Sequence, residues 1–180
     1  VGLPTTFTPW SMTPDGGVAG YANAINGGGI PAWNAPPVLM RLGPDLAPDA
    51  GFGAGGRVTV PAQILRVGPV AATATSVRVA GWDGNALLHG LFDAHGALVR
   101  VTRVPVSRTS PEGAMATRLI ISRGRSLVAG WSAAPASTVI AAFGADGRLD
   151  RRFGRAGLLR VKAGVFWSGA VAVLRDGRIV

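Results

Sequence analysis

Four short phrases recur along this chain in a fixed order at intervals near fifty residues, and this repetition constrains the fold more than any other feature. In the first phrase an apolar run ends in Ala-Gly followed by an aromatic residue, at residues 18–21, 79–82 and 128–131. Successive copies begin 61 and 49 residues apart. We therefore expect one small structural unit that is copied several times.

Three further phrases keep this order, and one of them is a two-residue turn ahead of the first phrase, at residues 15–16, 123–124 and 176–177. A turn phrase containing Asp and Gly or Pro follows each copy of the first phrase, at residues 42–45, 92–96 and 143–147. An Asp-x-x-Phe-Gly phrase occupies residues 49–56 and returns at residues 150–157, which is 101 residues later and equals two periods. The spacing between copies varies, and we expect the extra residues to lie in loops.

The segments between these phrases are typical of short strands. Residues 76–80 alternate apolar with polar or small side chains, whereas residues 171–174 form a continuous apolar run, as expected of a strand buried on both faces. Asp15-Gly16 indicates a hairpin, because a type I′ turn needs positive φ at both central residues. No stretch carries apolar residues at helical spacing over three turns, so we expect no long helix.

Four strands per period predict an all-β fold, a β-propeller made of four-stranded antiparallel blades, with about three and a half blades in this chain. The expected blades cover residues 9–61, 63–104 and 116–162, and an incomplete blade covers residues 169–180. A β-sandwich, with about seven to nine strands and no repetition, is the alternative. Because propellers close with about four to eight blades, we expect a continuation or a second chain to complete the ring.

Residues 147–157 and 170–180 resemble the delta-60 repeat of bacterial proteins. That repeat reads roughly Leu-Asp-x-x-Phe-Gly-x-x-Gly, a spacer, alternating Val and Ala, and Asp-Gly-Lys-Ile-Val-Val-Ala-Gly. Residues 48–56 match its first half, and residues 13–20 and 123–130 match its second half. The resemblance implies tandem blades in large secreted or surface proteins, which are generally of undefined activity.

Composition restricts the classes of function. The chain has no Cys, which excludes a disulfide framework, a thiolate metal site and a cysteine nucleophile. With two His and Glu112 as the sole Glu, no catalytic constellation stands out, and we expect no catalytic residue, no metal and no cofactor. No apolar stretch reaches the roughly 18–20 residues of a membrane span. Val1 in place of Met fits a processed or fragmentary chain, and we expect a secreted, periplasmic or cell-surface bacterial protein.

Positive charge is concentrated in the second half of the chain. The formal net charge is +9, of which residues 1–99 contribute −1 and residues 100–180 contribute +10. A basic half attracts anionic partners, which include nucleic acid, lipopolysaccharide, an acidic polysaccharide or an acidic protein face. A GC-rich genome also favours Arg without any partner, and this explanation is preferred. No run of five like charges is present, and nucleic acid is not the expected ligand.

Two groups of residues are candidates for ligand binding. Aromatic residues at equivalent positions, Tyr21, Trp82 and Trp131, suit stacking on sugar rings or bases. Trp33, in a Gly- and Pro-rich insertion, suits contact with a ligand or packing of the loop on its own blade. Recurrence in each repeat favours packing between blades for the first three. The second group, in one loop, suits bidentate binding of phosphate or carboxylate: Arg151, Arg152 and Arg155. A solvated edge that discourages strand addition is the alternative for these arginines.

We therefore predict an exported, non-catalytic β-propeller that serves as a binding or structural interaction module for a glycan or protein partner. The alternative is part of a propeller hydrolase or lyase whose catalytic residues lie mainly on a missing continuation or second chain. His89, which lies within an expected strand, is interpreted as a core or edge residue and not as a general base.

Overall fold

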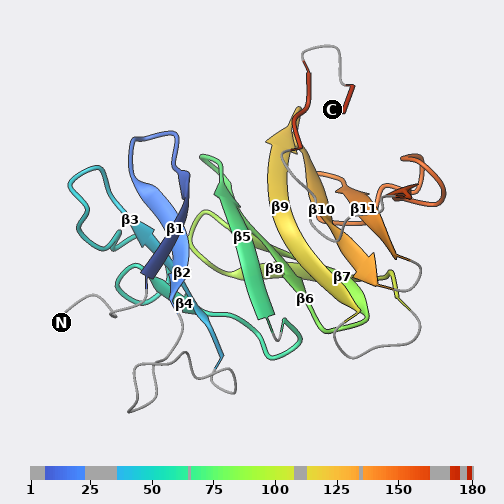
Figure 1. Ribbon diagram of the computed structural model, residues 1–180. Coiled ribbons are helices and arrows are strands. Elements are labelled where there is room, and N and C mark those ends of the chain that lie inside the picture. Colours follow the sequence, from blue (N-terminus) through green and yellow to red (C-terminus); the bar gives the residue numbers. More distant parts are fainter. Residues whose placement is uncertain are drawn as a thin grey trace.

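The computed structural model describes residues 7–22, 36–64, 66–107, 113–133, 136–162, 171–174 and 178–179. In these ranges the chain forms twelve β-strands and no helix (Figure 1). The strands are β1 (Phe7–Met12), β2 (Val18–Ala22), β3 (Val38–Leu42), β4 (Arg57–Thr59), β5 (Arg66–Ala72), β6 (Ser76–Trp82), β7 (Ala86–Asp93), β8 (Leu98–Pro105), β9 (Ala114–Ser122), β10 (Arg125–Ala133), β11 (Ala136–Phe143) and β12 (Leu158–Val161).

The strands assemble into three antiparallel sheets of four, each with its strands in chain order. We call them the first sheet (β1–β4), the second sheet (β5–β8) and the third sheet (β9–β12). The predicted all-β class and the predicted four antiparallel strands per repeat are confirmed. Among the described residues there is also no helix with the length and apolar character needed to cross a lipid bilayer.

The sheets pack face to face in chain order. β1 and β2 contact β5, and β5, β6 and β7 in turn contact β9. In Figure 1 the first strands β1, β5 and β9 lie side by side across the array. Each sheet is therefore most closely joined to the next through the first strand of that next sheet.

The recurring Val-Ala pair explains why the second strand of each sheet is buried on both faces. In β6, Val79 packs in the cluster shared with the first sheet, whereas Ala80 packs in the cluster shared with the third sheet. Successive side chains in a strand point to opposite faces, so two adjacent apolar residues serve two interfaces. Val128 and Ala129 repeat this division in β10.

The Gly that follows this pair is required by a bulge in the neighbouring first strand. A Cβ at Gly20 would lie 2.2 Å from Thr8 O, and a Cβ at Gly130 would lie 2.1 Å from Met115 O. At Gly81 it would lie 2.5 Å from the backbone O of the neighbouring strand β5. The register with the first strand shifts in all three sheets, which is the signature of a β-bulge.

The two copies of the Asp-x-x-Phe-Gly phrase fold alike although they lie 101 residues apart. In each copy the backbone N–H of Phe52 or Phe153 donates to the carbonyl three residues earlier, at 3.0 Å. The Gly that follows has φ 56° in the first copy and 52° in the second, a left-handed conformation that favours Gly. The sequence repeat is therefore also a structural repeat.

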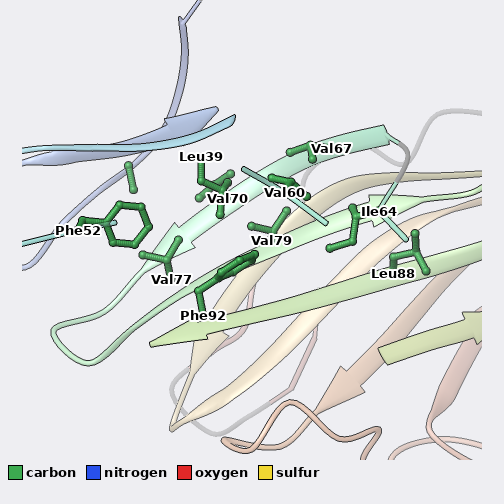
Figure 2. Close-up of a cluster of buried hydrophobic side chains, with 11 residues drawn as sticks. Leu39, Phe52, Val60, Ile64, Val67, Val70, Val77, Val79, Leu88 and Phe92 are labelled. Atoms are coloured by element: carbon green, nitrogen blue, oxygen red, sulfur yellow. The ribbon is translucent and has the colours of Figure 1, made fainter. Parts of the chain in front are cut away.

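The main apolar core lies between the first and second sheets. Figure 2 shows Leu39 and Phe52 of the first sheet meeting Val70 and Val77 of the second. Phe52 exposes only 1 % of its surface and packs in the cluster shared by the two sheets. A second core, between the second and third sheets, contains Phe143 at 0 % exposure.

A short C-terminal segment covers part of the outer face of the third sheet. Val171, Val173 and Ile179 pack against the cluster formed by Leu127, Ala129, Ile140 and Ala142, with Phe153 half-buried beside them. Val173 and Ile179 pair as an antiparallel bridge. Of the expected incomplete blade, residues 169–180, only 171–174 and 178–179 lie within the described part of the chain.

The hairpin turns differ in type. Arg123 and Gly124 have φ 50° and 76°, as a type I′ turn requires. At Asp15-Gly16 only Gly16 has a positive φ, of 87°, and the turn is longer because the N–H of Thr13 donates to the carbonyl of Gly17. Both turns still join adjacent antiparallel strands.

Candidate functional site

The loops lie at two opposite rims of the array. The first rim is the end of the array where, in each sheet, one turn joins the first strand to the second and another joins the third strand to the fourth. The second rim carries the turns from second to third strands and the links between sheets. This division separates the two groups of candidate residues.

The aromatic candidates lie toward the second rim, near the ends of β2, β6 and β10. Tyr21 is half-buried against the core between the first and second sheets, and Trp82 against the core between the second and third. This packing supports the interpretation of both as wedges between sheets. Trp131 is also half-buried, on the face of β10 that it shares with Ala129. Trp33 lies outside the described residues.

The arginine candidates lie at the first rim, in the loop between β11 and β12. Arg151, Arg152 and Arg155 are all exposed. The loop is held by its backbone, because the N–H of Arg155 donates to the carbonyl of Leu158 at 2.7 Å. Of the three, Arg152 lines an open cleft of about 370 Å³.

We call this hollow the arginine cleft. Its charged lining comes from turns of the third sheet and consists of Arg123, Arg125, Arg148, Arg152, Asp146 and Asp150. Four guanidinium groups and two carboxylates leave an excess of two positive charges. Arg125 pairs with Asp150, and Arg148 lies 3.5 Å from the exposed Asp146. The cleft therefore offers a positively charged, solvent-accessible surface for an anion.

Turn chemistry fixes the two carboxylates. One oxygen of Asp146 accepts the backbone N–H of Arg148 at 3.0 Å, and one oxygen of Asp150 accepts that of Arg152 at 3.2 Å. Asp is common in such turns because its side chain bonds the backbone two residues later. The other oxygen of each carboxylate faces an arginine, so both acids serve to order the arginines.

A second hollow, the inter-sheet cleft, lies between the second and third sheets at the same rim. Its volume is about 390 Å³, and it shares Gly124 and Ala145 with the arginine cleft. The polar lining includes Thr73, Thr75, Arg78 and Asp93, and the apolar lining includes Leu91, Val99 and Ile121. The two clefts therefore adjoin each other.

Arg78 is the unusual residue of the inter-sheet cleft. It exposes only 4 % of its surface, and its guanidinium donates to Ser126 Oγ at 2.5 Å and to the Gly124 carbonyl at 3.2 Å. Among the described residues no carboxylate pairs with it, and its Nε has no hydrogen-bond partner. Burial lowers the pKa of the Arg78 guanidinium.

His89 lies behind Arg78 and is fully buried. Its Nε2 is 3.1 Å from Ser126 Oγ, and its ring stacks on Phe143 with ring centroids 4.4 Å apart. Since Arg78 can only donate, Ser126 Oγ accepts from Arg78, and it shares a second hydrogen bond with His89 Nε2. Burial, and then the charge of Arg78, lowers the pKa of His89 to about 3.

The pair of Ser126 and His89 has the spacing of a nucleophile and its base, but no route for a substrate. Both residues have 0 % exposure. A catalytic pair must reach the reacting atoms, so this pair is a buried structural contact. The location of His89 in the core agrees with the interpretation made from the sequence.

Sequence reasoning missed the role of Arg78 and the inter-sheet cleft. A signal was present: Arg78 occupies the place that Leu127 takes in the third repeat, two residues before Ala80 or Ala129. A charged residue at a position that is apolar in a sister repeat marks a local departure from the core pattern. Among the described residues, no three His, Asp or Glu side chains gather as metal ligands.

No protein-family model matches the chain, and no curated protein matches it significantly.

Proposed function

We propose that this protein is an exported, non-catalytic binding module of β-propeller type that holds an acidic glycan at its first rim. The observation that supports this most directly is the arginine cleft, where four arginines and two aspartates converge. Guanidinium groups bind carboxylate and sulfate-like oxyanions through paired hydrogen bonds. The net charge of +9 adds a general attraction for anionic polymers.

Non-catalytic binding is favoured by what surrounds the clefts. The carboxylates of Asp146 and Asp150 are tied to arginines and to backbone N–H groups. His89 is sealed, and His95 lies in a turn where its Nδ1 is 3.4 Å from the carbonyl of Gly51 in the first sheet. These groups bind and order the loops, and none is free to serve as a general base at the arginine cleft.

The propeller assignment rests on the way the sheets are joined. The first strands β1, β5 and β9 follow one another, as the inner strands of blades do around an axis. The outer face of the third sheet is apolar and is met by Val171, Val173 and Ile179. We propose that further sheets of this kind, on a continuation or a second chain, complete the ring. The likeness to delta-60 repeats supports export from a bacterial cell.

Calorimetric titration of the full chain with polygalacturonate, dextran sulfate and neutral dextran tests this function. We expect binding to at least one acidic polymer, weakened by salt, and no binding to dextran. Joint substitution Arg148→Ala and Arg152→Ala is expected to lower the affinity about tenfold or more.

The matched control is Arg103→Ala, which removes a cation that pairs with Asp83 on the second rim. It is expected to leave the affinity unchanged. Equal titration curves for dextran and both acidic polymers contradict the proposal. Loss of binding in all arginine variants alike shows a response to net charge alone and also contradicts it.

A further inference from the structure

We infer that the inter-sheet cleft holds one sugar unit of the uronic-acid type, with its carboxylate on the guanidinium of Arg78. This inference rests on the proposed binding of an acidic glycan and specifies the chemistry that the site recognises. It follows from the burial and hydrogen bonding of Arg78, from the other groups in the cleft and from the position of the inter-sheet cleft next to the arginine cleft.

The first step concerns the charge of Arg78. A buried cation is costly unless an anion accompanies it, and within the described ranges the guanidinium of Arg78 has only a hydroxyl and a carbonyl as partners. Its Nε remains without a partner among the described residues, although Arg78 lines the cleft. An incoming carboxylate supplies the missing anion and is screened little by solvent at this depth.

The second step concerns the remaining lining. Asp93 uses one carboxylate oxygen for the N–H groups of His95 and Ala97, both at 2.9 Å, which leaves the other oxygen as an acceptor. Thr75, an exposed residue that carries a hydroxyl, also lines the cleft. An acceptor carboxylate opposes a bare anion such as phosphate but accepts hydrogen bonds from sugar hydroxyls. The cleft therefore suits a ligand that carries hydroxyls as well as an acid group.

The third step concerns shape. Leu91, Val99 and Ile121 give the cleft an apolar wall that fits the C–H face of a sugar ring. The volume of about 390 Å³ lies within the range of roughly 300–1,000 Å³ typical of small-molecule sites. Because the inter-sheet cleft shares Gly124 and Ala145 with the arginine cleft, a neighbouring acidic unit of the same glycan reaches the arginines.

The fold itself does not need a cation at this position. Leu127 occupies the equivalent place in the third sheet and packs in an apolar cluster. A strand of the same type is therefore built with an aliphatic side chain there. An anionic ligand explains why an arginine stands where the third sheet has an aliphatic side chain.

The test compares a short oligogalacturonate with its methyl ester of the same length, by calorimetric titration of the full chain. Esterification removes the charge and keeps the ring and its hydroxyls. We expect the ester to bind about tenfold or more weakly. Arg78→Leu is expected to reduce this difference severalfold, and the remainder comes from the acidic units at the arginine cleft, whereas the control Arg103→Leu, on the second rim, keeps the full difference.

Circular dichroism shows whether the Arg78→Leu variant is folded. If it is not, a second variant still tests the inference. Thr75→Val leaves the guanidinium intact and is expected to lower oligogalacturonate affinity about threefold. Equal affinity for acid and ester, or wild-type affinity in both variants, overturns the inference. If dextran sulfate then still binds through Arg148 and Arg152, only the inference fails; if no acidic glycan binds, the proposed function fails as well.

Discussion

The two interfaces between sheets are built from equivalent positions but with opposite chemistry. Between the first and second sheets, Leu39 and Val77 complete an apolar core around Phe52 and Phe92. Between the second and third sheets, the positions that correspond to Leu39 and Val77 hold His89 and Ser126. The comparison shows that two sheets pack well when apolar side chains fill these positions. The polar groups at the second interface therefore have a cause other than packing.

Hydrogen bonds across the two interfaces show the same contrast. At the second interface Thr102 Oγ1 donates to the Gly147 carbonyl at 2.8 Å, and Arg100 Nε donates to the Asp146 carbonyl at 3.1 Å. At the first interface a backbone contact between Gly53 N–H and the His95 carbonyl, at 2.8 Å, serves a similar purpose. Ser132 Oγ also donates to the Val106 carbonyl at 2.9 Å, so side-chain hydrogen bonds join the second and third sheets at both rims.

The largest effect is expected at the apolar interface. Phe52→Ala removes a fully buried ring from between two sheets, and we expect it to lower the free energy of unfolding by about 3–5 kcal/mol. Urea unfolding followed by circular dichroism measures this change. Phe153→Ala, the equivalent substitution in the third sheet, is the control and is expected to cost less because Phe153 is only half-buried. Equal losses contradict the view that the first interface depends on this wedge.

The next effect separates a polar interface from an apolar one. Ser126→Val leaves the Arg78 guanidinium and the His89 ring without their shared partner, and we expect a loss of about 1–3 kcal/mol. The triple variant Arg78→Leu, His89→Leu and Ser126→Val copies apolar residues from sister sheets and is expected to recover that loss. Recovery is the sign that polarity here is not required for stability. A triple variant less stable than Ser126→Val contradicts this.

The third effect depends on pH. The pKa of His89 falls to about 3 in the folded protein from an ordinary value of 6.5, so the unfolded chain binds the proton first. The contribution of His89 is therefore complete above pH 6.5 and is lost as pH falls from 6.5 toward 3. We expect a loss on the order of 1 kcal/mol per pH unit in this window. His89→Leu is expected to flatten the profile of unfolding free energy against pH; an unchanged slope contradicts this.

The repeats made the architecture predictable. Strand boundaries follow from phrases such as Val79-Ala80-Gly81, because alternation and the glycine at the bulge are local requirements that each copy satisfies in the same way. The loop that holds Arg151, Arg152 and Arg155 was also identified from the sequence, since Arg152 lies in a repeated turn where no packing role in the core is expected. The whole arginine cleft could not be predicted, because Arg123 and Arg148 come from other turns that only the fold brings together.

The inter-sheet cleft was not predictable from one strand at a time. Arg78 alternates with Val77 and Val79, and this pattern is typical of a strand with one solvated face. The packing of the third sheet buries that face instead. The pairing of Arg78 with Ser126, 48 residues later, depends on how two sheets meet and leaves no mark in local sequence.

The smallest effects concern glycines in equivalent turns of the two interfaces. Gly96 and Gly147 have φ 84° and 75°, and a Cβ on Gly96 would lie 2.5 Å from Val58 Cγ2, whereas one on Gly147 would lie 3.2 Å from the Leu91 side chain. Left-handed strain of about 1 kcal/mol is common to both alanine variants. We expect Gly96→Ala to lower the unfolding free energy by about 2 kcal/mol and Gly147→Ala by about 1 kcal/mol, measured by urea unfolding.

The equivalent turn of the first sheet supplies the control. There Leu46 holds φ 61° with 60 % of its surface exposed, so this backbone conformation tolerates a side chain where no sheet packs on it. Leu46→Gly is expected to change stability by less than about 1 kcal/mol, because relief of strain opposes the greater freedom of Gly in the unfolded chain. If Gly96→Ala costs no more than Gly147→Ala, close approach of the sheets is not what selects Gly at the first interface. The difference between the two alanine variants therefore measures how tightly the apolar interface is closed compared with the polar one.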